Sequence, residues 1–176
     1  MNVWHDIDPS RVTAEEFVAI IEISKGSKVK YELDKVTGML KLDRILYTST
    51  HYPANYGFIP RTYADDNDPL DVLVLCSEQI HPMTLVNCCP IGMISMIDSG
   101  SGDEKIIAVA KDDPIYSRYT NISELPSHMF EEMKHFFSVY KMLENKSTIV
   151  DRLNDKEVAI ETISKAISSY NQKFGK

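Results

Sequence analysis

The segment DNDPLDVLVL, residues 66–75, joins a cluster of acids to a strand that must be buried. Asp66, Asp68 and Asp71 fall within six residues, and the apolar run VLVL follows at once. That run is apolar on both faces, which predicts a strand in the closed interior of a barrel or sandwich. Pro69 argues against a helix at this point. We therefore expect a turn that ends where Asp71 opens the strand, which places the three carboxylates at the mouth of the sheet.

Strands are predicted on both sides of this segment, and two helices are predicted at the end of the chain. The stretch SKVKYELDKVTGMLKLDRIL predicts a hairpin with its turn at Thr37 and Gly38. Further strands are expected within 13–23 after a short helical start, at 85–98 and at 104–110, with a proline-bracketed loop at 51–60. Apolar residues at helical spacing predict helices at 127–144 and 158–170. This order indicates an α+β, β-dominated fold whose sheet curls into a small barrel with helices outside.

The composition is that of a globular protein with an excess of acids. The 176 residues suit a single domain spanning 1–176, and a hydrophobic fraction of 43% is enough for a packed core. The formal net charge of -7 argues against nucleic-acid binding, which needs a basic surface. No stretch approaches a membrane span, the start is not a secretory signal, and the three cysteines suggest no disulfide framework. We expect a cytoplasmic protein without a membrane or nucleic-acid partner.

The acidic cluster needs compensating charge. Two carboxylates ~5 Å apart near a surface repel by ~3 kcal/mol at an effective dielectric constant of about 20, and three raise one another's pKa unless cations are present. Sites with only oxygen ligands select hard divalent ions, and magnesium is favoured where phosphate shares the site. For an isolated D-x-D, a solvated turn with Asx hydrogen bonds is the more frequent explanation. An EF-hand does not fit, because its central glycine is missing and a proline interrupts the ligand positions.

A second pair of acids and a set of cations and phenols accompany this cluster. Asp98 and Asp103 bracket a loop rich in Ser and Gly, which on its own is most often a plain hairpin. The polar residues that could bind a phosphate are Lys30, Glu32, Arg44, Tyr52 and Tyr56. Surface hairpins often alternate Lys and Glu for solubility, so periodicity alone does not choose between the two explanations.

Together these segments resemble the soluble inorganic pyrophosphatases of family I, in their bacterial form. The segments that match in order and spacing run from Glu22 to Glu144: IIEIS, KYELDK, LDR, HYPANYGFIP, DNDPLDVLVL, the Asp98–Lys105 loop and HFFSVYKMLE. The combination of D-x-D-P-x-D-V with Y-P-x-N-Y-G is specific. The resemblance implies a five-stranded, OB-like β-barrel with helices packed outside. It also implies magnesium-dependent hydrolysis of diphosphate to two orthophosphates.

The resemblance further implies roles for individual residues. Asp68 is the implied general base. The implied metal ligands are Asp66, Asp71 and Asp103 for the tighter ion, with Asp71 bridging to a second, and Asp98 and Asp103 for ions that arrive with the substrate. The implied phosphate clamp is Lys30, Arg44, Tyr56, Lys105, Tyr140 and Lys141. The resemblance also implies that Glu22 and Glu32 hold metal-bound water and that Tyr52 lies near the clamp. It implies a further active-site acid, Asp43, whose role it leaves open.

Two departures from the family pattern affect different parts of the chain. Asn67 stands where the family has glycine, and the turn is expected to survive because asparagine tolerates left-handed backbone angles. After Glu144 the chain lacks the aromatic pattern of many bacterial members, so the last helix and the subunit contacts are less well specified. Bacterial relatives often form hexamers with a helical histidine near the trimer contact. We therefore expect a homo-oligomer, with a hexamer favoured and His135 as the residue to test.

Two other functions share parts of this pattern. A nucleotide or polyphosphate phosphohydrolase would use similar chemistry, but the chain has neither a Nudix-type helix nor a His-rich phosphodiesterase site. A substrate panel separates these enzymes. An OB-fold module that binds oligonucleotides would need a basic, aromatic face, and an acidic chain with clustered aspartates predicts poor binding.

Overall fold

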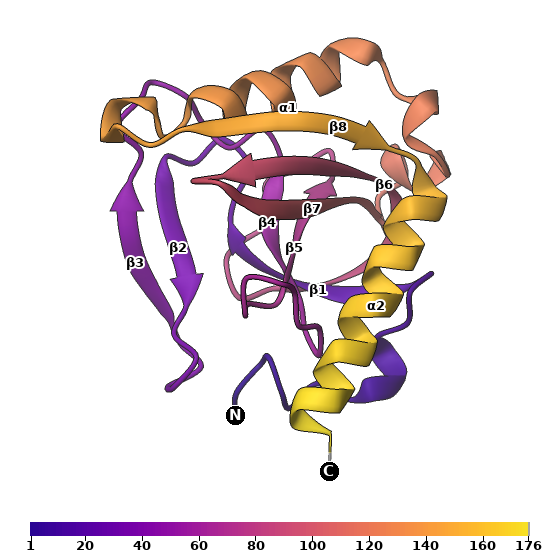
Figure 1. The fold of residues 1–176 in the computed structure, drawn as a ribbon. Helices are drawn as coiled ribbons and strands as arrows, with labels where there is room; N and C mark the ends of the chain where they lie inside the picture. The colour runs from indigo at the N-terminus through magenta and orange to yellow at the C-terminus, as the bar shows by residue number, and fades with distance from the viewer. Residues whose placement is uncertain (176) are drawn as a thin grey trace.

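Figure 1 shows the fold in a computed structural model that describes residues 1–175. The strands in this range are β1 (Phe17–Ile23), β2 (Val29–Leu33), β3 (Leu40–Ile45), β4 (Asn55–Ile59), β5 (Leu70–Leu75), β6 (Leu85–Asp98), β7 (Ser101–Ala110) and β8 (Thr148–Asn154). The helices are α1 (Ser127–Val139) and α2 (Lys156–Phe174). The short 3-10 turns are η1 (Pro9–Arg11), η2 (Tyr116–Arg118), η3 (Ile122–Glu124) and η4 (Met142–Glu144).

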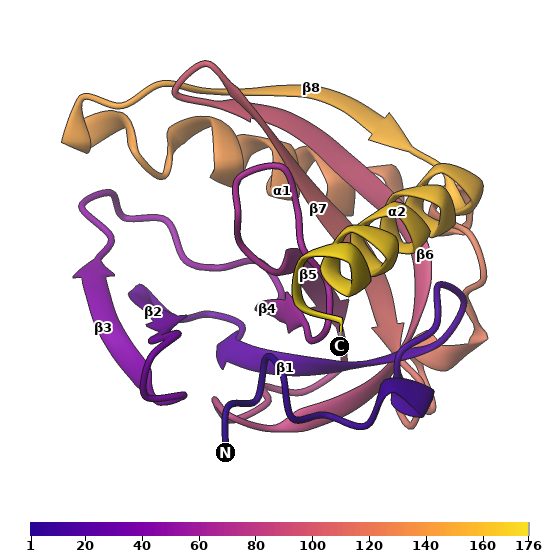
Figure 2. The ribbon, with the colours of Figure 1, turned by 60° about the horizontal axis from the view of Figure 1, so that its bottom comes forward.

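Five strands close into a barrel. Their order is β1-β4-β5-β7-β6, and β6 pairs again with β1 to complete the ring. β8 extends the sheet beyond β6, and the β2–β3 hairpin stands beside the barrel, at the left of Figure 1. Only β5 and β7 run parallel within the ring. The predicted five-stranded barrel is confirmed, and α1 and α2 lie on its outside (Figure 2).

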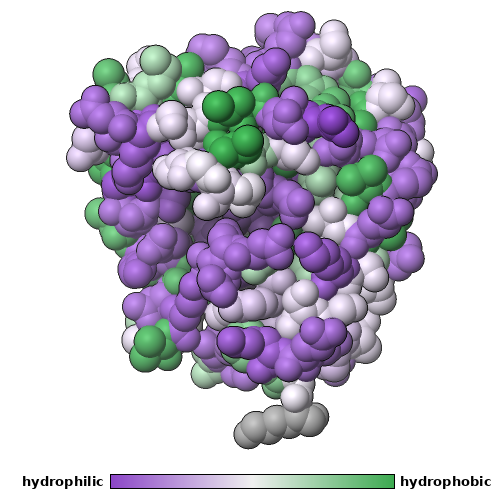
Figure 3. All heavy atoms as spheres, in the orientation of Figure 1, coloured by the Kyte–Doolittle hydropathy of each residue, from purple (hydrophilic) through white to green (hydrophobic). Residues whose placement is uncertain are grey.

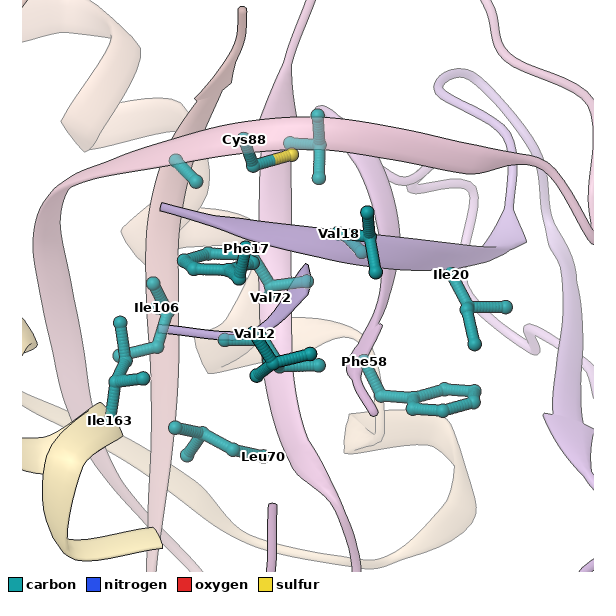
Figure 4. Packing of buried hydrophobic residues seen from close by; sticks show 14 of the residues in the cluster. Val12, Phe17, Val18, Ile20, Phe58, Leu70, Val72, Cys88, Ile106 and Ile163 are labelled. Carbon is teal, nitrogen blue, oxygen red and sulfur yellow. The ribbon is translucent and has the colours of Figure 1, made fainter. Parts of the chain in front are cut away.

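Strand β5 is buried on both faces, as its apolar run predicted. Val72 and Val74 belong to a hydrophobic cluster that includes residues of α2, whereas Leu73 and Leu75 belong to a second cluster that includes residues of α1. Figure 4 shows the first cluster, in which side chains from β1, β4, β5, β7 and α2 meet. Fully burying one such side chain is worth about 1.5–3 kcal/mol. Packing on both faces therefore fixes the position of β5 and of the residues at its start.

Strand β4 occupies a segment for which the sequence predicted a loop. All five of its residues are buried, and the bracketing Pro53 and Pro60 lie outside its hydrogen-bonded ladder. Prolines at these positions leave the pairing intact. The backbones of β4 and β1 approach so closely that a Cβ atom on Gly57 would lie 1.8 Å from the carbonyl oxygen of Ile20. The absence of a side chain at Gly57 permits this contact.

Two shorter segments also differ from the prediction. Residues 13–16 form a turn instead of a helix, with the Thr13 amide donating to the Glu16 carbonyl oxygen over 2.9 Å. β8 follows α1 in a segment where no strand was predicted. Most of its residues are exposed, so it lacks the apolar run that would have indicated a strand. Its pairing with β6 supplies the order instead.

The two predicted helices are present with altered ends. α1 ends at Val139, and the rest of the predicted helix tightens into η4, which stops at Asn145 in the left-handed region with φ 56°. α2 begins after Asp155, whose side chain accepts a hydrogen bond from the Val158 amide, and it continues past the predicted end to Phe174. Neither helix in residues 1–175 has the length and apolar composition needed to cross a bilayer.

Candidate active site

Strand register places several of the predicted site residues on one face at the barrel mouth. Asp71, near the start of β5 as predicted, lies opposite Phe58 of β4 and Lys105 of β7. Side chains alternate along a strand, so residues two positions apart share a face. Tyr56 lies two residues from Phe58, and Asp103 lies two residues from Lys105. The ladder therefore brings an aspartate pair, a lysine and a phenol together.

Lys105 is the centre of this group. Its ammonium lies 2.8 Å from Asp71 Oδ2, 2.9 Å from the Tyr56 hydroxyl and 3.1 Å from Asp103 Oδ2. The side chain is only 3% exposed. Burial acts to lower the pKa of Lys105, but Asp71, Tyr56 and Asp103 together raise it well above its usual value. Lys105 is therefore a buried ammonium, which is tolerated because its partners compensate the charge.

The acidic turn has the conformation expected from the sequence. Asn67 adopts a left-handed backbone with φ 70°. The Asp68 amide donates to Asp66 Oδ1 over 3.0 Å, and the Ala64 amide donates to the Asp68 carbonyl oxygen over 2.8 Å. Lys35 contacts the carboxylate of Asp68. The Asx bond that a solvated turn would also form is present, and the turn in addition lies beside Asp71 at the barrel mouth.

Asp98 and Asp103 lie on strands rather than within a loop. β6 and β7 are joined by Ser99 and Gly100 alone, both with positive φ, as in a tight two-residue hairpin. Asp98 pairs with Lys141, which follows α1. Burial acts to raise the pKa of Asp98, but the hydrogen bond and charge of Lys141 outweigh it, so the pKa is lowered. Asp98 therefore ends β6, Asp103 lies near the start of β7, and both line the same cavity.

Two further predicted carboxylates differ sharply in environment. Glu22 of β1 is buried and accepts a hydrogen bond from the Leu33 amide over 2.8 Å. Burial, and then the charge of Asp71, raises the pKa of Glu22 to about 8. Glu22 is therefore largely protonated at neutral pH when no cation is bound. Glu32 of β2 is partly exposed and pairs with Lys41 at 3.0 Å.

The hairpin carries two cations that share one carboxylate. Lys30 of β2 lies opposite Arg44 of β3. Asp43 Oδ2 accepts from Lys30 Nζ over 2.7 Å and from Arg44 Nη1 over 2.6 Å. Arg44 Nε also lies 2.9 Å from the carboxylate of Glu144 in η4. Asp43, whose role the sequence left open, bridges the two cations in this structure.

The predicted tyrosines form an aromatic layer between the barrel and α1. The Tyr52 ring centroid lies 5.2 Å from that of Tyr56 and 4.8 Å from that of Phe136. Tyr140 caps the C-terminal end of α1 and is buried. Burial raises the pKa of Tyr52, Tyr56 and Tyr140 well above the usual value, so all three remain protonated phenols at neutral pH.

These groups surround a cavity of about 500 Å³. The predicted residues in its wall are Glu22, Lys30, Glu32, Tyr56, Asp66, Asp68, Asp71, Asp98, Asp103, Lys105, Tyr140 and Lys141. Asp43, Arg44 and Tyr52 were predicted as well, but they do not line it. On the face of the molecule that is seen in the orientation of Figure 1, hydrophilic side chains dominate and hydrophobic residues form small groups (Figure 3). The wall combines oxygen donors suited to cations with ammonium and phenol donors suited to a polyanion.

Comparison with known proteins assigns the chain to a family. The model of the family described as inorganic pyrophosphatase matches residues 19–171. The chain belongs to the inorganic pyrophosphatase family. It is similar to soluble inorganic pyrophosphatase 1 of Arabidopsis thaliana, with 49% identity over 95% of this chain and 79% of the relative. It is also similar to soluble inorganic pyrophosphatase PPA1 of Solanum tuberosum, with 50% identity over the same shares.

Solved pyrophosphatase structures share the whole fold. The inorganic pyrophosphatase of Helicobacter pylori superposes with a TM-score of 0.90 and 42% identity, over 94% of this chain and 99% of that one. The enzyme of Thermus thermophilus gives a TM-score of 0.89 with 35% identity, over 97% and 99% of the two chains. The resemblance inferred from sequence motifs is confirmed. Pyrophosphatases of this family depend on a metal.

The acids of this pyrophosphatase chain suit a hard metal ion. Asp66, Asp71 and Asp103 supply only oxygen ligands. Burial, followed by the charge of Asp71, raises the pKa of Asp66. Burial also raises the pKa of Asp103, against the opposing charge of Lys105. A divalent cation would relieve this repulsion and favour the ionised acids.

Metal binding requires the side chains to rearrange. As they stand, no three His, Cys, Asp or Glu residues within 1–175 are grouped to hold one ion. In this structure the ammonium of Lys105 lies between Asp71 and Asp103. A cation that binds both acids would therefore displace Lys105 from them.

Among the residues near the pyrophosphatase cavity that were not singled out as site residues, three form ion pairs with residues that were. Lys35 and Lys41 line it, and Glu144 binds Arg44 behind its wall. Lys35 stands in the KYELDK motif, but at a turn, where a lysine is ordinarily solvated. Glu144 closes the HFFSVYKMLE motif, and nothing in its spacing indicates a partner on the distant hairpin.

Proposed function

We propose that this protein hydrolyses inorganic diphosphate to two orthophosphates, with magnesium as its cofactor. Membership of the inorganic pyrophosphatase family supports this function. The structural observation that carries it is the buried Lys105, bound to Asp71, Asp103 and Tyr56 in a cavity wall that also contains Asp68. A wall of this kind offers ligands for cations and donors for phosphate side by side.

The proposed chemistry divides between the acids of the site. Asp66, Asp71 and Asp103 would hold the tighter ion, Asp71 would also contribute to a second ion, and Asp98 and Asp103 would hold ions that arrive with substrate. Bound magnesium would neutralise phosphate charge and make water more acidic. Asp68 accepts the proton of the attacking water. Its turn holds it beside the ligands, and its side chain remains 48% exposed, so water reaches it. Glu22 and Glu32, which also line the cavity, would hold water molecules next to the ions.

The proposed phosphate clamp is Lys30, Arg44, Tyr56, Lys105, Tyr140 and Lys141, with Tyr52 packed behind Tyr56. In the structure Lys105 pairs with Asp71, and Lys141 pairs with Asp98. When cations satisfy these acids, the ammonium groups become available to phosphate oxygens. Charge spreads over the equatorial oxygens during phosphoryl transfer, and such donors can bind these oxygens in the substrate as well as in the transition state.

Phosphate release tests the proposed function directly. Purified protein is given diphosphate with magnesium, and the reaction is repeated after chelation. We expect release only with magnesium, and much less release from ATP or tripolyphosphate at the same concentration. Preference for ATP or tripolyphosphate would favour the alternative phosphohydrolase, and no release from any of the three would sink the proposal.

We also propose a cytoplasmic homo-oligomer, with a hexamer favoured. His135 is exposed on α1 and remains the candidate interface residue. Light scattering coupled to size exclusion gives the mass in solution. A monomer would overturn the assembly without affecting the proposed reaction.

A further inference from the structure

Glu144 is a buried carboxylate at the end of the chain segment that follows α1. Its side chain is 8% exposed, and both of its oxygens lie on Arg44 Nε, at 2.9 and 3.1 Å. The two residues come from elements far apart in the sequence, the β3 strand of the hairpin and η4. A well-formed pair between a guanidinium and a buried carboxylate restricts the orientation of the arginine.

The remaining donors of Arg44 show what this orientation leaves open. Nη1 donates to Asp43 Oδ2 over 2.6 Å. Nη2 is buried and has no hydrogen-bond partner among the described residues. A buried donor without a protein partner is unfavourable, and such groups are commonly satisfied by water or a ligand. Nε and Nη1 of the guanidinium are thus bound by acids, and Nη2 has no protein partner among the described residues.

Arg44 lies directly behind the cavity wall. The oxygen of Asp43 that binds Arg44 also binds Lys30, which lines the cavity. The turn that contains Glu144 follows Tyr140 and Lys141, which line the cavity as well. The Arg44–Glu144 pair therefore joins two of the segments that carry the phosphate clamp, the hairpin and the turn after α1.

We propose that Glu144 is a positioning residue for Arg44, which it holds by Nε so that the guanidinium stays beside Asp43 and Lys30 in the proposed phosphate clamp. This inference rests on the proposed function, because it assumes that the cavity receives phosphate. Glu144 itself touches no substrate. It keeps the guanidinium of Arg44, on the hairpin, at a fixed position relative to Tyr140 and Lys141.

The test compares Glu144→Ala with Glu144→Gln. The amide oxygen of glutamine still accepts from Arg44 Nε, whereas alanine leaves Nε without a partner. We expect Glu144→Ala to raise the KM for diphosphate about tenfold, with kcat within about threefold of wild type, because the ground state and transition state lose the same contact. Glu144→Gln should stay within about threefold of wild type in both. Glu131→Ala is the control, since Glu131 is an exposed acid of α1 that pairs only with His128 among the described residues.

A double substitution separates a positioning role from a general structural one. If Glu144 acts through Arg44, adding Glu144→Ala to Arg44→Ala should change KM by less than about twofold. Titration of each protein with inorganic phosphate in magnesium buffer provides a readout that does not need turnover. The dissociation constant for phosphate should weaken in Glu144→Ala by about the same tenfold factor. The melting temperature of each variant shows whether it is folded.

Each result has one meaning. Additive effects of Glu144→Ala and Arg44→Ala would overturn the inference, as would tighter phosphate binding by Glu144→Ala, which would mean that Glu144 holds Arg44 back. Unchanged phosphate binding by Arg44→Ala would overturn it as well. Wild-type protein that releases no phosphate from diphosphate overturns the proposed function, and the phosphate titration still tests the pair.

Discussion

Individual residues in the site are held by ion pairs that a ligand would replace. Lys105 binds Asp71, and Lys141 binds Asp98, so each cation neutralises an acid that is a proposed metal ligand. The net stability of such a buried pair is small, because the cost of desolvation offsets the attraction. A metal ion can therefore replace the ammonium on each acid, and a phosphate can replace the carboxylate on each ammonium. The exchange of both partners together has a small energetic cost. Substitution of an acid should affect catalysis more than folding wherever its side chain is partly exposed.

Asp68 gives the clearest case. Asp68→Asn cannot accept a proton from water, so we expect kcat for diphosphate to fall by about 10²–10⁴-fold. The fold should persist, because the lost pair with Lys35 is a surface contact of little net value. Asp65→Asn is the control, since Asp65 is 81% exposed and lies 3.4 Å from Lys165. Phosphate release measures turnover, and circular dichroism checks the fold. Near wild-type kcat in Asp68→Asn would show that another group is the base.

The raised pKa of Glu22 predicts that the free energy of unfolding depends on pH in protein from which metal has been removed by a chelator. This pKa is raised to about 8 in the folded state, from a reference value of 4.5. Between these values the folded state keeps a proton that the unfolded chain has released, so the stability from this group falls as pH rises, by about 1.4 kcal/mol per pH unit. Glu22→Gln removes this dependence and keeps an oxygen for the Leu33 amide. We expect its free energy of unfolding in urea to gain on wild type steadily from about pH 5 to about pH 8. Parallel pH curves for the two proteins would contradict a protonated Glu22.

Strands and turns with a clear local sequence pattern were predicted. Strands whose formation depends on pairing with distant strands were not. The apolar run of β5 and the turn glycine of the β2–β3 hairpin, Gly38 at φ 75°, are local signals, and both elements are present. β4 was taken for a loop because its prolines dominate the local pattern. β8 depends on pairing with β6 and carries few buried residues. Long-range pairing of this kind leaves little trace in a single sequence.

The site shows the same division. Residue pattern alone placed the acids from Asp66 to Asp71 at the mouth of the sheet, whereas the roles of Asp98 and Asp103 came from the family resemblance. The clamp came from the family resemblance, because alternating Lys and Glu on a hairpin also describes an ordinary surface. Glu144 escaped both, since its significance depends on a contact across the fold.

The close approach of β1 and β4 at Gly57 predicts that the barrel does not tolerate a side chain at this position. Gly57→Ala would place a Cβ atom 1.8 Å from the Ile20 carbonyl oxygen, and only a separation of β1 from β4 relieves that clash. We expect a loss of at least about 3 kcal/mol in the free energy of unfolding, at the upper end of overpacking effects. Gly102→Ala is the matched control, because nothing lies within 4 Å of a Cβ at that position, and its effect should stay within about 0.5 kcal/mol. Urea unfolding of both variants decides. A Gly57→Ala protein as stable as wild type would mean that β1 and β4 separate freely.

For the whole molecule, the site is a product of barrel closure. Its wall draws on residues from Glu22 of β1 to Lys141 after α1, and β5 and β7 meet as parallel neighbours at its centre. The protein carries a net charge of -7 and gathers several acids at one mouth. Folding therefore works against carboxylate repulsion that bound cations would relieve. Metal binding and global stability should be linked.

This linkage predicts that magnesium raises the melting temperature. A ligand that binds only the folded state at 100 times its dissociation constant adds about 2.7 kcal/mol, which for a chain of this size corresponds to roughly 5–10 °C. Sodium chloride at equal ionic strength should give a much smaller shift, because screening alone leaves no cation bound between the acids. Asp71→Asn should lose most of the magnesium-specific shift, since Asp71 is the ligand proposed to be shared between ions, whereas Asp65→Asn should retain it. Calorimetry of the three proteins with and without magnesium measures the effect. An equal shift in Asp71→Asn and wild type would place the stabilising ion elsewhere and would remove the basis for a metal site at the barrel mouth.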